Sequence, residues 1–287
     1  MLLGCLSLYA ADNDLITKQI TINLEKAGTL PDRIGSSKKY KITNLKIIGE
    51  INGTDLRMIR DMAGSSSNGN STDGKLSVLD LSKAKIVEGG DCYYIDYYTS
   101  NDVIGSYAFS GCNRLTSLTL PAGINEIGSY AFKDCSGLTN LTIPAGITEI
   151  SYGVFNGCRG LTSLTIPAGI IWISSNAFDG CSGLTSIYVY AEKVPYIGSN
   201  VFVGVDAKEC TLYVPMGTRD DYRLSGFGNY FENIVEFEAT GIDKTTTSTD
   251  VEEVARYSVN GQRLSAPTKG LNIVKYSDGS VKKVAVQ

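Results

Sequence analysis

Cysteines are the residues of this sequence whose type and spacing most directly suggest chemistry. Cys112, Cys135, Cys158 and Cys181 follow one another at intervals of 23 residues, which would suit a metal site, a set of disulfides or a column of buried thiols. No Cys-x-x-Cys pair occurs, and parallel Cβ vectors in such a column are poorly aimed for a disulfide. We therefore favour buried free thiols, with metal binding and disulfides as the alternatives.

The composition excludes several classes of catalyst. The chain has 287 residues, a formal net charge of −4 and no histidine. Without imidazole there is no Ser-His-Asp triad, no Cys-His pair and no histidine ligand for zinc or copper. The mildly acidic balance, with no basic run, also argues against a nucleic-acid partner. We predict a protein that is not an enzyme and that carries no cofactor and no metal.

One short motif imitates a phosphate-binding loop. Gly69 and Gly74-Lys75 have the P-loop spacing, but Leu76 stands where serine or threonine is required. Leu76 also begins an expected strand, whereas a phosphate loop leads into a helix. We interpret the match as coincidence. The same loop lacks the acidic twelfth ligand of a calcium-binding hand.

The cysteines belong to a longer repeat. A segment of the form Ile-Gly-Ser-Tyr-Ala-Phe begins at Ile104, Ile127, Ile150, Ile173 and Ile197, and Leu-Thr-Ser-Leu-Thr-Leu-Pro-Ala-Gly-Ile and its variants lie between the copies. The roughly six large apolar side chains of one unit supply about 10–18 kcal/mol when buried. Ordering the backbone of the unit costs about 25–45 kcal/mol. A single unit is therefore unstable, and neighbouring units must share one core.

Alternation within each unit predicts which side chains point outward. Leu118 and Leu120 point inward, so Ser117 and Thr119 point outward from a short strand that ends before Pro121. Parallel stacking of these strands predicts a ribbon with two outward columns. The first column is Asn44, Val78, Ser117, Asn140, Ser163, Ser186 and Thr211, and the second is Lys46, Asp80, Thr119, Thr142, Thr165, Tyr188 and Tyr213. The same stacking predicts a file of the inward phenylalanines, Phe109, Phe132, Phe155 and Phe178.

The pattern Leu-x-x-Leu-x-(Leu/Ile)-Pro-x-x-Ile-x-x-Ile-Gly-x-x-Ala-Phe-x-Gly-Cys resembles the BspA-like leucine-rich repeat family of anaerobic commensal bacteria. The resemblance implies a right-handed leucine-rich repeat solenoid, α/β to mainly β, with a short parallel β ribbon and a cap at each end. It also implies a secreted or cell-surface protein with a role in recognition or adhesion. The expected partner is a protein or a glycan, with host extracellular matrix as one source.

The composition divides the chain into five expected parts. No segment is apolar over the length of roughly 20 residues that a spanning helix needs. Residues 1–11 look like either the remnant of a secretory signal peptide or a lipobox with Cys5 as the lipid anchor, and the second reading would make an outer-membrane lipoprotein. The other parts are an N-terminal cap with irregular repeats (12–103), regular repeats with a C-terminal cap (104–237), a linker (238–254) and a small β module (255–287) that resembles C-terminal segments of secreted bacterial proteins.

Helix signals flank the regular repeats. Thr29 opens a short helix with proline inside its first turn, and residues 55–62 form an amphipathic helix. After the repeats, Thr218 is the expected N-cap of a further helix with Asp221 at its third position, and residues 230–237 return as a strand.

Exposed aromatic residues are the candidate contacts, because tyrosine and tryptophan are enriched at binding hot spots. One group lies toward the last coils: Trp172, Tyr188, Tyr190, Tyr196 and Tyr213. A second group lies in an insertion and either binds a partner or packs over the first coils: Tyr93, Tyr94, Tyr97 and Tyr98. The predicted function is non-catalytic binding or adhesion through the solenoid surface. The alternative is a structural or assembly component of the cell surface.

Overall fold

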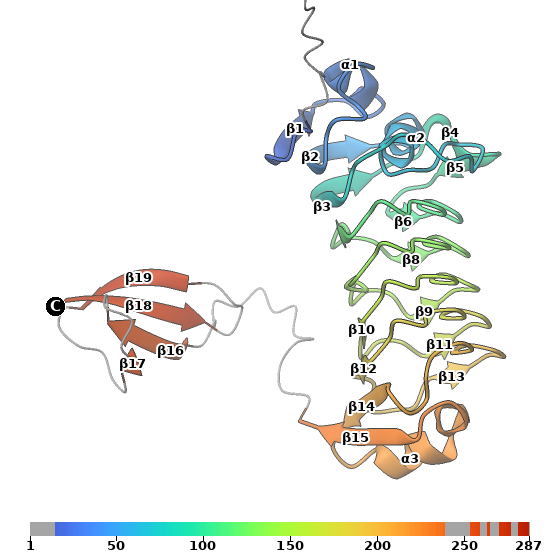
Figure 1. Cartoon of the computed structure of the whole chain (residues 1–287), viewed down its shortest axis with the longest axis vertical. Coiled ribbons are helices and arrows are strands. Elements are labelled where there is room, and N and C mark those ends of the chain that lie inside the picture. Colours follow the sequence, from blue (N-terminus) through green and yellow to red (C-terminus); the bar gives the residue numbers. More distant parts are fainter. Residues whose placement is uncertain (1–14, 239–252, 259–262, 265–269, 277–280, 287) are drawn as a thin grey trace, which may run out of the picture. The chain divides into compact units, whose positions relative to one another are not determined.

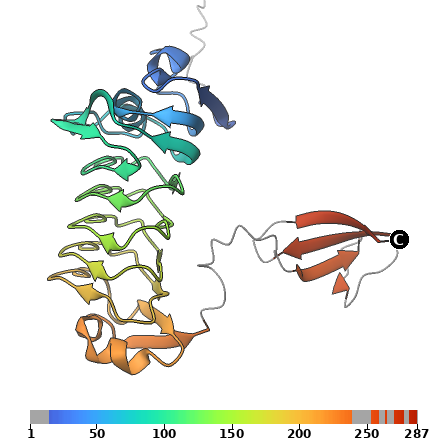
Figure 2. The ribbon, with the colours of Figure 1, turned by 180° about the vertical axis from the view of Figure 1, so that it is seen from behind.

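The computed structural model describes residues 15–238, 253–258, 263–264, 270–276 and 281–286, with side chains for residues 15–238. The chain divides into two compact units, Met1–Asp243 and Lys244–Gln287. In the first unit, coils of similar shape are stacked one on another, and Figures 1 and 2 show this stack from opposite sides. The expected signal remnant or lipobox and most of the expected linker lie outside the described residues.

Parallel strands form a ribbon along one side of the stack (Figure 1). The strands are β1 (Ile20–Leu24), β2 (Asn44–Ile51), β3 (Val78–Ile86), β7 (Ser117–Thr119), β10 (Ser163–Ile166), β12 (Ser186–Val189), β14 (Thr211–Pro215) and β15 (Asn233–Phe237). They make two four-stranded sheets, β1-β2-β3-β7 and β10-β12-β14-β15, and single bridges at Asn140 and Thr142 lie between these sheets. The register confirms the outward columns: Lys46 pairs with Asp80, and Thr165 pairs with Tyr188.

A second row of strands, each of two residues, follows the turn after the ribbon. Its members are β6 (Val103–Ile104), β8 (Glu126–Ile127), β9 (Glu149–Ile150), β11 (Trp172–Ile173) and β13 (Tyr196–Ile197). Their pairing is parallel, with β6 beside β8 and β11 between β9 and β13. In β8, β9 and β11 the first residue is exposed and the isoleucine is buried, so this row has an outward column of its own.

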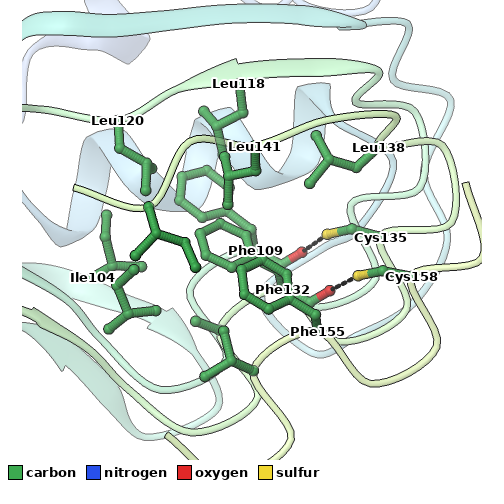
Figure 3. Packing of buried hydrophobic residues seen from close by; sticks show 14 of the residues in the cluster. Ile104, Phe109, Leu118, Leu120, Phe132, Cys135, Leu138, Leu141, Phe155 and Cys158 are labelled. Atoms are coloured by element: carbon green, nitrogen blue, oxygen red, sulfur yellow. Dashed lines mark hydrogen bonds between the residues drawn. The ribbon is translucent and has the colours of Figure 1, made fainter. Parts of the chain in front are cut away.

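The core is a file of phenylalanines, as the repeat predicts (Figure 3). The rings of Phe109, Phe132, Phe155 and Phe178 stack with centroids 5.3–5.6 Å apart and planes within 11° of parallel. Phe202 continues the file at 5.4 Å from Phe178. These rings are at most 1% exposed, so adjacent coils share a single interior.

The repeated cysteines are buried thiols beside this file. The thiol of Cys135 donates a hydrogen bond to the Phe109 carbonyl at 3.0 Å, and Cys158 and Cys181 repeat the contact one coil later each time. Burial raises the pKa of the Cys112 thiol to about 11. The interpretation as buried free thiols is therefore confirmed by their burial and hydrogen bonding.

Two helices pack near the start of the stack. They are α1 (Leu30–Ile34) and α2 (Gly53–Met62). α2 begins two residues earlier than expected because Asn52 accepts a hydrogen bond from Thr54 N at 3.1 Å and completes a capping box with Asp55. The Asp55 carboxylate also accepts from Gly28 N and Leu30 N, at 2.6 and 2.8 Å, and so joins the start of α1 to α2.

The loop that imitates a P-loop runs from the end of α2 to β3, which is the reverse of the strand-to-helix order that a phosphate loop needs. The insertion after β3 forms a two-stranded hairpin of β4 (Gly89–Tyr94) and β5 (Tyr97–Thr99). No helix among the described residues has both the length and the hydropathy needed to cross a membrane.

After the last repeat, α3 (Arg219–Leu224) and the 3-10 helix η1 (Gly226–Asn229) lead into β15. Thr218 is the N-cap residue of α3, as predicted, but its side chain does not cap the helix, because its hydroxyl donates to the Pro215 carbonyl at 2.7 Å. Glu236 serves this end of α3 instead, since its carboxylate accepts from Gly217 N and Arg219 N at 2.9 and 3.0 Å.

The second unit is a four-stranded antiparallel sheet with the order β17-β16-β18-β19. Its strands are β16 (Glu253–Ser258), β17 (Arg263–Leu264), β18 (Gly270–Tyr276) and β19 (Val281–Val286). The neighbours β16–β17 and β18–β19 each pair antiparallel.

Candidate binding surfaces

The last strands of the ribbon carry an aromatic cluster. Tyr188 on β12 and Tyr213 on β14 are register partners, so their rings stack with centroids 4.4 Å apart and planes 7° from parallel. The ring of Phe237 meets Tyr188 and Tyr190 edge-on, at 5.8 and 5.1 Å. All four side chains are half-buried. We call these four residues the ribbon cluster.

Trp172 and Tyr196 lie elsewhere, on the second row of strands. The rings are 5.8 Å apart and tilted by 34°, and the residues are 44% and 67% exposed. The Trp172 Nε1–H donates to Ser174 Oγ at 3.1 Å, and that hydroxyl donates to Glu149 Oε1 at 2.9 Å. The five aromatics expected to gather near the last coils thus separate into two surfaces, because they come from two different rows of strands.

The tyrosines of the insertion divide between packing and exposure. Tyr93 does not belong to a contact surface, because it is 1% exposed and its hydroxyl donates to the Ser106 carbonyl at 2.8 Å. Tyr94 is half-buried and stacks on Tyr107 at 5.2 Å. Tyr97 and Tyr98 are 40% and 60% exposed. Packing over the first regular coil therefore describes Tyr93 and Tyr94 and, in part, Tyr97, whose ring lies 5.3 Å from that of Tyr107, while Tyr98 is the most exposed of the four.

Sequence reasoning missed a ladder of tyrosines at the turn that follows the second row. Tyr107 stacks on Tyr130 at 5.2 Å, and Tyr130 meets Tyr152 edge-on at the same distance. Tyr107 and Tyr130 have φ near +58°, which is uncommon for a bulky residue. A hydrogen bond with Tyr152 and burial raise the pKa of Tyr130 to about 12. The sequence feature that could have predicted this ladder is the tyrosine at the fourth position of the two exact copies of Ile-Gly-Ser-Tyr-Ala-Phe, which begin at Ile104 and Ile127.

Arg60 was also missed, because it lies in a helix outside the regular repeats. The side chain is 0% exposed, and its guanidinium is 4.6 Å from the centre of the Tyr94 ring. Nη1 donates to the Ala108 carbonyl at 3.0 Å, and Nη2 donates to the Ser110 carbonyl at 3.1 Å. A buried cation with no carboxylate is costly, so these backbone acceptors must compensate it.

One hollow of the first unit, about 510 Å³, lies between the two N-terminal helices and the 65–74 loop and is lined by Pro31, Lys39, Thr54, Arg57, Asp61 and Asp91, among others. Another, about 360 Å³, lies where the ribbon is interrupted, between Ser117 and Pro144. Within the described residues, no three cysteine or carboxylate side chains lie together in a way that could hold a metal ion.

Comparison with known proteins identifies the repeat. Residues 102–218 match the family described as "BspA type Leucine rich repeat region", in six copies. This match confirms the resemblance and the leucine-rich repeat fold of that part of the chain. No curated protein matches the chain.

Three solved bacterial structures are similar to parts of this chain. A leucine rich cell surface protein from Faecalibacterium prausnitzii is 27% identical, with a TM-score of 0.33, over 49% of this chain and 31% of that chain. The pneumococcal vaccine antigen PcpA is 15% identical, with a TM-score of 0.37, over 71% of this chain and 61% of that chain. A leucine-rich repeat protein from Bacteroides ovatus is 17% identical, with a TM-score of 0.28, over 76% of this chain and 69% of that chain. The chain thus spans less than a third of the length of the first of these proteins.

Proposed function

Because residues 102–218 are BspA-type leucine-rich repeats, we propose that the chain is a non-catalytic binding protein that acts outside the cell, secreted or held at its surface. It recognises a protein or a glycan of an extracellular surface and so serves in adhesion. In this proposal the repeats wind as a right-handed solenoid, and residues 12–103 and the elements after Pro215 close its two ends. The apolar N-terminus is either a signal remnant or a lipid anchor at Cys5.

The observation that carries the proposal is the ribbon cluster. Tyr188 and Tyr213 are outward residues of a ribbon whose preceding coils present Thr142 and Thr165 in the same column. Their rings hold each other in place, and Phe237 packs edge-on against Tyr188, so little side-chain entropy is lost when a partner covers them. Rigid aromatic area beside hydroxyl groups is the composition typical of recognition hot spots.

The hydroxyl columns of the ribbon support the same function. Ser163, Ser186 and Thr211 are paired across β10, β12 and β14, and each is half-exposed. Each hydroxyl can donate one hydrogen bond and accept others, so the ribbon offers a regular row of weak polar contacts. Such a row adds specificity around an aromatic centre that supplies most of the binding energy.

An array of glycans and extracellular-matrix proteins probed with the full chain tests the proposal. We expect a saturable signal that falls by about tenfold or more when Tyr188 and Tyr213 are both replaced by alanine. Tyr152→Ala is the matched control, because it removes a tyrosine that is 40% exposed and belongs to neither group of candidate contacts. Circular dichroism must show that both variants keep their fold.

Two results would contradict the proposal. The first is binding that survives the double replacement unchanged. The second is the absence of any saturable signal together with regular self-association in light scattering, which would favour the structural or assembly alternative.

A further inference from the structure

A column of two carboxylates and two aromatic rings lies on the second row of strands. Glu149, Trp172 and Tyr196 are register partners on β9, β11 and β13, and Glu126 holds the same position on β8, one repeat earlier. We propose that this column, Glu126–Glu149–Trp172–Tyr196, binds an arginine or lysine side chain of a partner protein. The inference rests on the proposed binding function only for the existence of a partner, and it concerns a different surface from the ribbon cluster.

The aromatic half of the column is open to solvent and held in place. Trp172 and Tyr196 are 44% and 67% exposed, and their rings are 5.8 Å apart. The indole N–H is already satisfied by Ser174, so the indole needs no further hydrogen-bond acceptor from a ligand. What the ring still offers is its π surface, and tryptophan is the aromatic side chain that attracts a cation most strongly.

The acidic half supplies the matching charge. Ser174 donates to Oε1 of Glu149, while Oε2 has no hydrogen-bond partner among the described residues. Neither Glu126 nor Glu149 forms an ion pair with a lysine or arginine in the described part of the chain. Adjacent strands lie about 4.8 Å apart, so Glu149 and Glu126 lie about 5 and 10 Å along the column from Trp172, and both distances are within the Debye length at low salt.

This combination selects among ligands by charge. Two unpaired carboxylates repel phosphate, sulfate and acidic sugars, and they attract a cation toward the rings. An arginine guanidinium can stack on Trp172 and donate to the free oxygen of Glu149 at the same time, because it is planar and carries five donors. A neutral sugar could use the rings but would gain nothing from the charge of Glu149, and this difference makes the proposal testable.

Trp172 is the chain's single tryptophan, so its fluorescence reports on this column directly. The full chain is titrated with a hexapeptide of alternating glycine and arginine, at about 20 mM and about 150 mM salt. The comparison peptide carries citrulline, which keeps the shape of arginine without its charge. Glu149→Gln removes the charge while keeping an oxygen that can accept from Ser174. Glu209→Gln, an exposed carboxylate outside the column, is the matched control for net charge.

We expect a saturable change of Trp172 emission with the arginine peptide, weaker at the higher salt concentration. The citrulline peptide and the Glu149→Gln variant should each bind about twofold to fivefold more weakly, the range of one exposed cation–π or ion contact. Glu209→Gln should bind as the unmodified chain does. Unchanged thermal melting of both variants shows that the fold is retained.

The proposal is overturned if the arginine peptide gives no saturable change at low salt, or if citrulline binds equally well. It is also overturned if Glu209→Gln weakens binding as much as Glu149→Gln, because the attraction would then be non-specific. Saturable binding of a neutral oligosaccharide in place of the arginine peptide would assign the rings to sugar instead. Array binding that is lost on replacement of Tyr188 and Tyr213 would meanwhile leave the proposed function standing, whatever the peptides do.

Discussion

Replacing Arg60 by methionine should loosen the first regular coil, because Arg60 occupies the place of a missing neighbour. Between regular coils, the amides of Phe109 and Gly111 donate to the carbonyls of Ala131 and Lys133, at 2.7 and 2.8 Å. The carbonyls of Ala108 and Ser110 are equivalent to these acceptors, one repeat earlier. They accept from the Arg60 guanidinium instead.

The carbonyl of Ser106, next to these acceptors, also accepts from a side chain in place of a backbone amide, but the donor is a different residue. Tyr107 N donates to Ser129 O at 3.1 Å, and the equivalent acceptor one repeat earlier is Ser106 O. That carbonyl accepts from the hydroxyl of Tyr93 at 2.8 Å. Two side chains from the irregular region thus replace three backbone amides of an absent coil.

The size of the effect follows from these contacts. Arg60→Met leaves the carbonyls of Ala108 and Ser110 without their donor and weakens the bonding of Tyr107 O, to which Nη1 donates at 2.7 Å. Each unsatisfied buried acceptor costs about 1–3 kcal/mol. Removing the buried cation offsets only part of this loss, because the backbone carbonyls already compensate much of the cost of burying its charge. The expected net loss is about 2–4 kcal/mol in the free energy of unfolding.

Hydrogen exchange is the decisive assay, because a repeat array can open at one end without unfolding as a whole. Peptides covering residues 102–112 should exchange faster in Arg60→Met, while those covering residues 150–181 keep their protection. Arg57→Met is the matched control, since Arg57 lies on the same helix and is exposed. Suppose that Arg60→Met leaves hydrogen exchange in the first coil unchanged and alters the free energy of unfolding by less than about 0.5 kcal/mol. The idea that side chains take the place of backbone amides would then be refuted.

Three further predictions concern the stack itself. Phe155→Ala should lower the free energy of unfolding in urea by about 3–5 kcal/mol, because the ring lies between two others; a loss below 1 kcal/mol would contradict the shared core. Gly153→Ala should cost about 1–3 kcal/mol, since the added Cβ would lie 2.5 Å from the Tyr130 ring and the residue has a φ of +59°. In a double-mutant cycle, Tyr130→Ala should recover only the part of that loss that comes from the ring, because the backbone strain remains. The pKa of the Cys112 thiol is raised from 9.0 to about 11 in the fold, so its contribution to stability is complete below pH 9 and is lost as the pH rises through 11. Cys112→Val should remove that part of the alkaline decline in urea midpoints, and an unchanged decline would show that the thiol is not its source.

The sequence predicted the interior of the repeats well, because period and alternation depend only on local spacing. A residue that returns every 23 positions must meet its own copy in the next coil, so the file of Phe109 and Phe132 and the column of Cys135 and Cys158 followed from arithmetic. The same argument placed Tyr188 outward beside Tyr213.

The predictions failed where a contact joins two segments that are not copies of the same repeat. The bonds from Arg60 to the first coil cross 48 and 50 residues of sequence, and nothing in the helix pattern distinguishes Arg60 from Arg57. Thr218 is the N-cap residue of α3, but a carboxylate brought back by β15 takes the role expected of its side chain. Tyr93 was grouped with its exposed neighbours because four tyrosines in six residues give no indication of which one turns inward.

Specificity for a partner is more easily built on the outward column of the second row of strands than in the core. Inward positions are nearly constant from coil to coil, because each phenylalanine must match the ring above and below it. The outward position of the second row is free of that constraint, and it changes from glutamate at 126 and 149 to tryptophan at 172 and tyrosine at 196. A change from charge to aromatic area stabilises no core and exposes apolar surface to water, which carries a cost in solubility. The exposed rings are explained if a partner binds to both the carboxylates and the rings. The titration with the arginine peptide tests this explanation directly.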